Sequence, residues 1–144
     1  MKPYASVADL QAIGLPESAF VPPEDVTQAK FDAAVTEQLL TTSAMAETYL
    51  RGSGLYALPL TGTIPVELTR AVCHLMAPDF LAWRGYNPDQ FDAVYAERAA
   101  AALAWLKDVA KRIVVLDLPA PPPGTPTNSG PGRAGISTKP KRGW

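Results

Sequence analysis

The chain has 144 residues, 47% of them hydrophobic, so it is long enough for one domain with a packed core. Its formal net charge is only −1, and its single cysteine, Cys73, excludes an intrachain disulfide and favours a cytosolic setting. We expect a soluble intracellular protein, because the N-terminus lacks the apolar core of a signal peptide and the longest strongly apolar run, residues 99–106, is too short to span a membrane.

A short helix is predicted over residues 7–13. Ser6 is placed to cap its start, and Asp9 stands where the acid of a capping box is expected. Gly14 fits the left-handed position that often follows a helix. A connector over residues 15–23 comes next, and its two adjacent prolines prevent helix formation there.

A long second helix is predicted over residues 25–51. Its apolar residues recur at spacings of mostly three and four, which makes one broad buried stripe. Glu24 and Asp25 favour its start through the helix dipole, and Gly52 and Gly54 are expected to end it.

A short loop with several Gly and Pro residues separates this helix from the next. Tyr56, Leu58 and Leu60 are expected to anchor the loop to the core, and two prolines to stiffen it. Its glycines allow the exposed part to bend, so the loop can present a defined surface to a neighbouring protein. The candidate partner-binding residues in this stretch are Gly52, Gly54, Thr61 and Gly62.

The third helix is predicted to begin at Pro65, because the missing N–H of a proline would have no intrahelical partner in the first turn. Pro78 lies inside the helical pattern and is expected either to kink the helix or to restart it near Asp79. Gly85 is expected to end the helix.

The fourth helix is predicted to start at Asn87, Pro88 and Asp89, which supply a cap, a first-position proline and a first-turn acid. It should run to about Arg112. Residues 113–116 are rich in β-branched side chains, so they are predicted to form either a short strand or an extended packing segment.

The composition changes after Asp117, which marks a domain boundary. Residues 1–117 carry nine basic and all 14 acidic residues, a net charge of −5, whereas residues 118–144 carry four basic residues and no acid. This Pro- and Gly-rich tail cannot bury enough apolar surface to order by itself, so we expect a flexible basic arm that becomes ordered on assembly. Its candidate partner-binding residues are Arg133, Lys139, Lys141, Arg142 and Trp144.

The predicted fold class is therefore all-α. It consists of a small bundle of three to four helices over residues 1–117, followed by a long, extended Pro/Gly-rich C-terminal arm. The aromatic residues of the bundle fall on apolar stripes and are expected to pack in its core. These residues are Tyr49, Tyr56, Phe80, Trp83, Phe91, Tyr95 and Trp105.

No pattern of reactive side chains indicates an enzyme. His74 and Cys73 are neighbours on a predicted helix, so their side chains point about 100° apart and cannot form a nucleophile–base pair. A zinc site needs several Cys or His ligands, and the glycines near residue 53 lack the sequence of a phosphate-binding loop. We therefore expect no catalytic residue, no cofactor and no metal, and a structural role for His74.

Several segments resemble one known family when they are taken in chain order. They are Tyr-Ala-Ser-Val-Ala-Asp-Leu at 4–10, Leu-Tyr-Ala-Leu-Pro-Leu at 55–60, Ile64-Pro65, a helix with Cys73, Tyr-Ala-Glu-Arg-Ala at 95–99 and Ala-Trp-Leu-Lys-Asp-Val-Ala at 104–110. This ordered set resembles the phage Mu gp36-like proteins, a family of head–tail connector or adaptor proteins. The resemblance covers roughly residues 3–117.

The chain departs from the family pattern at three places. The family usually has a glycine after the last helix, where Lys111 and Arg112 stand here. Pro78 interrupts a helix that is often uninterrupted in related proteins. The basic arm resembles an extension of the family's fold.

The resemblance implies a helical adaptor in the neck of a virion, assembled in the host cytoplasm. Such proteins form a homo-oligomeric ring, often a dodecamer, between the portal protein and a tail-side connector or tail terminator protein. DNA passes through the lumen without sequence-specific binding, and no membrane is involved. The run of small residues at 99–102 and the loop between the second and third helices are expected to supply contacts between subunits.

A small helical nucleic-acid-associated regulator that uses the basic arm is the alternative reading. The distribution of charge distinguishes the two, because a nucleic-acid binder is expected to carry basic residues on its folded body. Here the body has a net charge of −5 and only the arm is strongly basic.

Overall fold

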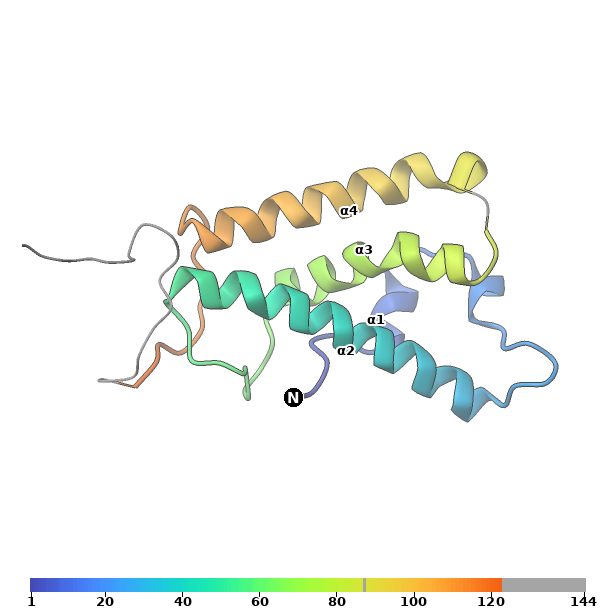
Figure 1. The fold of residues 1–144 in the computed structure, drawn as a ribbon, viewed down its shortest axis with the longest axis horizontal. Helices are drawn as coiled ribbons and strands as arrows, with labels where there is room; N and C mark the ends of the chain where they lie inside the picture. The colour runs from blue at the N-terminus through green and yellow to red at the C-terminus, as the bar shows by residue number, and fades with distance from the viewer. Residues whose placement is uncertain (87, 123–144) are drawn as a thin grey trace, which may run out of the picture.

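A computed structural model describes residues 1–86 and 88–122 of the chain. Its elements are α1 (Val7–Ala12), the 3-10 helix η1 (Glu17–Phe20), α2 (Gln28–Ser53), α3 (Val66–Trp83) and α4 (Pro88–Ala110), as Figure 1 shows. Within these two ranges the structure contains helices and no strand, so the all-α prediction is confirmed. The short η1 helix falls in the connector that was predicted to have no helix.

The three long helices form the body of the bundle. α2, α3 and α4 contact one another in pairs, and α1 packs against both α2 and α3. The largest fully buried side chains come from all four α-helices and from the N-terminal segment. They are Tyr4, Leu10, Phe31, Val35, Leu39, Leu50, Leu68, Val72, Met76, Phe80, Leu81 and Leu106.

The first helix starts and ends as its sequence predicts. Ser6 Oγ accepts a hydrogen bond from the backbone N–H of Asp9 at 3.2 Å, and the Asp9 carboxylate accepts one from the N–H of Ser6 at 2.8 Å. This capping box satisfies two N–H groups at the start of the helix. Gly14 lies beyond the end with φ of 91°, in the left-handed region that glycine adopts without strain.

The second helix begins later than predicted. Its N-cap is Thr27, whose hydroxyl oxygen accepts a hydrogen bond from the N–H of Lys30 at 3.2 Å. Residues 24–26 form a turn and a bend before this cap, so the predicted start at residue 25 is wrong. The helix also runs past residue 51 to Ser53, and Gly54 closes it in the left-handed conformation with φ of 72°.

The third helix is continuous through Pro78, so the predicted restart near Asp79 is wrong. A proline inside a helix removes one backbone hydrogen bond. The fully buried neighbours Ala77 and Phe80 hold the two sides of this turn in the core. Pro65 is the N-cap of the helix rather than a residue of its first turn.

The fourth helix ends at Ala110, two residues before its predicted end at Arg112. Of the two alternatives for residues 113–116, the strand is wrong, because residues 113–114 form a bend and residues 115–116 have no regular secondary structure. Its Leu116 is buried, whereas Ile113 and Val115 are exposed.

The prediction that the aromatic residues pack in the core is confirmed for Tyr56 and Phe80, which are buried, and is wrong for Trp83. Trp83 is 47% exposed, and its indole lies over the Phe31 ring with the centroids 5.8 Å apart. It is the last residue of α3. The side chain of Phe91 lies outside the described part.

Candidate functional site

Hydrogen bonds fix the loop between α2 and α3 at three points. The Tyr56 hydroxyl is buried and accepts a hydrogen bond from the N–H of Leu116 at 2.8 Å. The N–H of Ala57 donates to the carbonyl of Pro119 at 2.9 Å, and the N–H of Leu60 donates to the Tyr4 hydroxyl at 3.3 Å. The loop is therefore held by both the N-terminal segment and the segment that follows α4, as Figure 1 shows on the side where α2 ends.

Tyr4 connects four parts of the fold. Its N–H donates to Ser43 Oγ at 2.8 Å, and its hydroxyl donates to the Glu47 carboxylate at 2.9 Å, both on α2. Its carbonyl accepts a hydrogen bond from the Thr69 hydroxyl of α3 at 2.9 Å. Burial, partly offset by the Leu60 N–H and reinforced by the Glu47 carboxylate, raises the pKa of Tyr4 to about 12. The hydroxyl therefore stays protonated and keeps donating to Glu47 at neutral pH.

The four predicted partner-binding residues near the loop fall into two pairs. Thr61 and Gly62 are exposed, and they lie between the last of these fixed points, Leu60, and the start of α3 at Val66. Gly52 lies in the last turn of α2, where a Cβ atom would stand 3.8 Å from Cβ of Ala110, and Gly54 closes that helix. The first pair is available to a partner, and the second pair shapes the end of α2.

The predicted residues of the arm, Arg133, Lys139, Lys141, Arg142 and Trp144, lie outside the described residues. The contacts of the body nevertheless extend past the predicted boundary at residue 117. Leu118 is half-buried and packs against the core, and the carbonyl of Pro119 accepts the hydrogen bond from Ala57. These contacts show where the body's ordered packing continues into the arm.

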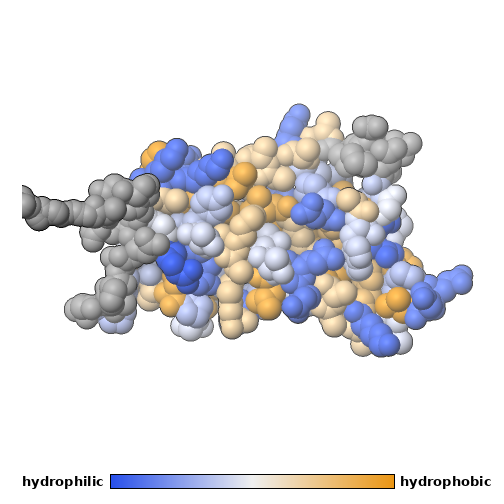
Figure 2. Space-filling view, in the orientation of Figure 1, coloured by the Kyte–Doolittle hydropathy of each residue, from blue (hydrophilic) through white to orange (hydrophobic). Residues whose placement is uncertain are grey.

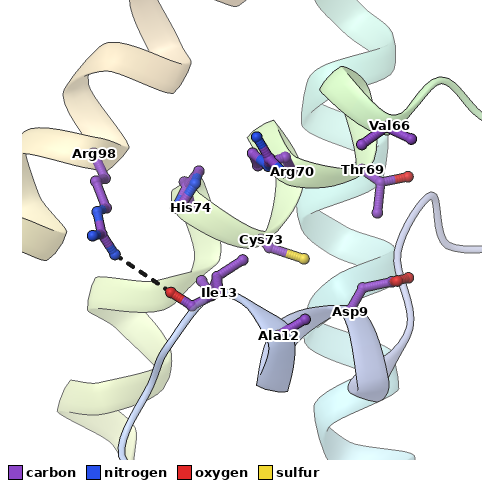
Figure 3. A pocket seen from close by; sticks show the side chains of 9 residues that line it. All are labelled: Asp9, Ala12, Ile13, Val66, Thr69, Arg70, Cys73, His74 and Arg98. Atoms are coloured by element: carbon purple, nitrogen blue, oxygen red, sulfur yellow. Dashed lines mark hydrogen bonds between the residues drawn. The ribbon is translucent and has the colours of Figure 1, made fainter.

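A pocket of about 430 Å³ lies between α1, α3 and α4, and the sequence did not predict it. Figure 3 shows the imidazole of His74 between the guanidinium groups of Arg70 and Arg98. Arg98 reaches across from α4 and donates to the carbonyl of Ile13 at 3.4 Å. Asp9 is the acid in the lining, and its carboxylate is already engaged in the capping box.

The basic groups of this pocket have unused hydrogen-bonding capacity. Among the described residues, Arg70 has no hydrogen-bond or ion-pair partner, and Nδ1 of His74 is buried without one. Burial, and then the charges of Arg98 and Arg70, lower the pKa of His74, so its imidazole is neutral at neutral pH. Arg70 and His74 are four residues apart on one helix, a spacing that the sequence does reveal. Arg98, in contrast, reaches the pocket only because α4 packs against α3, which no spacing along the sequence reveals.

Clusters of metal ligands and membrane-spanning helices are both absent from the part of the chain that the structure describes. In residues 1–86 and 88–122, no three His, Cys, Asp or Glu side chains are grouped so that they could hold a metal ion. No helix in the same ranges has the length and hydropathy to cross a membrane. On the face seen in Figure 2, hydrophobic residues lie in small patches between hydrophilic ones, which is typical of surfaces that form mixed polar and apolar contacts.

Comparison with known protein families gives a match to the family described as Bacteriophage Mu, Gp36, over residues 4–134. Searches among curated proteins and among solved structures give no match. The family match runs past residue 117, so the first part of the arm is not an extension of the family's sequence. A Pro- and Gly-rich stretch has little periodic pattern, which is why the resemblance was not recognisable there. The chain therefore belongs to the Bacteriophage Mu, Gp36 family, which makes it a phage protein of virion structure or morphogenesis.

Proposed function

We propose that this protein is a head–tail adaptor, a structural subunit that forms a ring between portal and tail through which viral DNA passes. The observation that carries the proposal is the family match over residues 4–134. The ring is proposed to be a dodecamer that binds the portal protein on one side and a tail-side connector or tail terminator protein on the other. No catalytic or cofactor-dependent role is proposed.

The loop between α2 and α3 supports this proposal. A ring of identical subunits needs two different patches on each subunit, which meet head to tail. The loop tip at Thr61 and Gly62 is exposed, and it lies between Leu60, which is buried and hydrogen-bonded, and the start of α3 at Val66. A tip held in this way loses little conformational entropy when a neighbour binds it.

The charge of the body supports a passage for DNA rather than a tight DNA-binding surface. Affinity for duplex DNA comes mainly from basic side chains that neutralise phosphates. The body has a net charge of −5, so it attracts phosphate weakly. The basic arm is proposed to bind the portal, the tail-side protein or a neighbouring subunit, and to become ordered as it does so.

Deletion of the gene from its phage tests the proposal. DNA-filled heads and complete tails should accumulate without joining, and a plasmid copy of the wild-type gene should restore joined particles. An antibody against the protein should label the neck in electron micrographs. Joined particles without the protein, or label only on the head shell or the tail tip, would contradict the proposal.

A further inference from the structure

The pocket between α1, α3 and α4 has the chemistry of a carboxylate site. It presents two guanidinium groups, from Arg70 and Arg98, beside an imidazole whose buried Nδ1 has no hydrogen-bond partner. Arginine binds carboxylate through a fixed, planar set of donors. Among the described residues neither Arg70 nor Arg98 forms an ion pair, so neither guanidinium has a carboxylate partner within the pocket.

An apolar groove continues from this pocket between α3 and α4. A second cavity of about 400 Å³ shares Arg70, His74 and Arg98 with the first. It is lined further by Glu67 and by the apolar side chains of Val66, Ala71, Ala101, Ala102 and Trp105. The two cavities together form an amphipathic groove, which fits a short segment that carries acids beside an apolar side chain.

The chain itself contains such a segment before α2. Glu24 and Asp25 are the only adjacent pair of acids in the sequence, and both are exposed. They lie in a turn closed by a hydrogen bond from the N–H of Val26 to the carbonyl of Pro23 at 3.0 Å. The side chain of Val21, at the start of this segment, is 60% exposed.

This acidic turn, residues 21–26, is held at its base and projects from one end of the bundle in Figure 1. Arg84 donates to the carbonyl of Val21 at 2.5 Å and to that of Ala19 at 2.9 Å, which fixes where the turn leaves the body. No residue of the turn lines either cavity of the groove. The turn and the groove are thus two separate patches, which is the arrangement that head-to-tail assembly requires.

We propose that the groove binds the acidic turn of a second copy of this chain, with the carboxylates of Glu24 and Asp25 facing Arg70, Arg98 and His74. The apolar side chain of Val21 then lies against the part of the groove lined by Val66 and Trp105. A DNA phosphate is a weaker candidate, because it offers no apolar side chain to the part of the groove lined by Val66 and Trp105. This inference rests on the proposed ring, and it assigns the contact between neighbouring subunits.

Charge reversal of the purified full-length chain tests the contact by sedimentation velocity. The groove variant carries Arg70→Glu and Arg98→Glu, and the turn variant carries Glu24→Lys and Asp25→Lys. Each should self-associate at least about 30-fold more weakly than the wild type, because charges that attracted now repel. Controls with the same change in net charge are Lys30→Glu with Lys107→Glu and Glu37→Lys with Asp79→Lys, all at exposed positions, and these should associate like the wild type. Circular dichroism checks that each variant is folded.

Mixing the two variants gives a sharper result. The acidic turn of the groove variant is attracted to the basic groove of the turn variant, and the lysine turn of the turn variant is attracted to the glutamate groove of the groove variant. The mixture should therefore recover higher oligomers in which the two variants alternate, and a chain that carries all four substitutions should recover them by itself.

Three outcomes would overturn the assignment. They are a wild type that stays monomeric at millimolar concentration, variants that associate like the wild type, and a mixture that does not associate. Variants that keep wild-type rings leave the adaptor proposal intact, since another surface then makes the ring. Loss of affinity for short duplex DNA in the groove variant, with association unchanged, would identify phosphate as the ligand instead.

Discussion

Arg112 donates its Nε hydrogen to the carbonyl oxygen of Ser53 at 2.8 Å, which joins the turn after α4 to the last residue of α2. The last carbonyls of a helix have no intrahelical donor, so this bond caps α2 from another part of the chain. Arg112 also has φ of 64°, in the left-handed region that costs most residues about 1–2 kcal/mol. The bond to Ser53 therefore offsets part of the cost of this backbone conformation.

Two substitutions of Arg112 separate the contribution of the hydrogen bond to stability from the cost of the strained backbone. Arg112→Ala loses the bond and keeps the strain, so the free energy of unfolding should fall by about 1–2 kcal/mol. Arg112→Gly loses the same bond but relieves the strain, so it should be less destabilising than the alanine variant. Urea unfolding measures both. A glycine variant that is the less stable of the two would show that the left-handed backbone costs nothing here.

Removal of the Tyr4 hydroxyl should destabilise the fold. Tyr4→Phe leaves the Leu60 N–H without its acceptor and the Glu47 carboxylate with one donor fewer, which should cost about 1–3 kcal/mol. Tyr49→Phe is the matched control, because the Tyr49 hydroxyl makes no hydrogen bond to the described residues. Equal losses in the two variants would contradict the role of Tyr4.

The raised pKa of Tyr4 predicts that the folded state loses stability at alkaline pH. Its pKa is raised from 10.0 to about 12 in the folded state, so the folded state holds a proton that the unfolded state releases first. The stabilising contribution is complete below pH 10.0 and is lost as the pH rises towards about 12. Urea unfolding between these pH values should show a steeper decline for the wild type than for Tyr4→Phe. Parallel curves would show that the hydroxyl does not titrate in this way.

The lowered pKa of His74 predicts that the folded state loses stability at acidic pH. Its pKa is lowered from 6.5 in the folded state, so the unfolded state takes up a proton first as the pH falls. Stability should decline below pH 6.5 by at most about 1.4 kcal/mol per pH unit, until the folded imidazole is also protonated. Because His74 is the only histidine, its NMR signal reports this pKa directly, and Arg70→Gln should raise it. His74→Gln should remove this part of the pH dependence, and an unchanged profile would contradict the assignment.

Two truncations test where the body ends. A chain that ends after Pro122 keeps the Pro119 carbonyl and should melt like the full chain. A chain that ends after Leu118 loses the acceptor of the Ala57 N–H and should be less stable by about 0.5–1.5 kcal/mol. Both should fail to join heads to tails if the arm is an assembly element. Strongly salt-dependent DNA binding that disappears with residues 118–144 would instead favour a nucleic-acid-associated regulator.

The loop tip should affect assembly and leave stability unchanged. Thr61→Arg combined with Gly62→Arg adds bulk and charge at exposed positions, and no atom lies within 4 Å of a Cβ placed at Gly62. The double variant should melt like the wild type and fail to complement the gene deletion. Ala44→Arg, at an exposed position on α2, should complement. Normal complementation by the tip variant would remove the loop from the proposed interface.

The sequence by itself determined those helix boundaries that depend only on residues close to them along the chain. The capping box of Ser6 and Asp9, the left-handed Gly14 and the start of α4 at Pro88 are all settled within a few positions along the chain. A helix cap needs only a side chain and the next turn of backbone, so local reasoning finds it. Local reasoning missed Thr27, because two acids nearby also favour a helix start.

Only the tertiary structure decided the features that depend on several helices at once. The continuity of α3 through Pro78 depends on packing on both sides of that turn. The bond from Tyr4 to Glu47, and the meeting of Arg98 with His74, join positions far apart in the sequence. Such pairs form where packing brings them together, because hydrogen bonds and charges act over a few ångströms of space, whatever the separation along the chain.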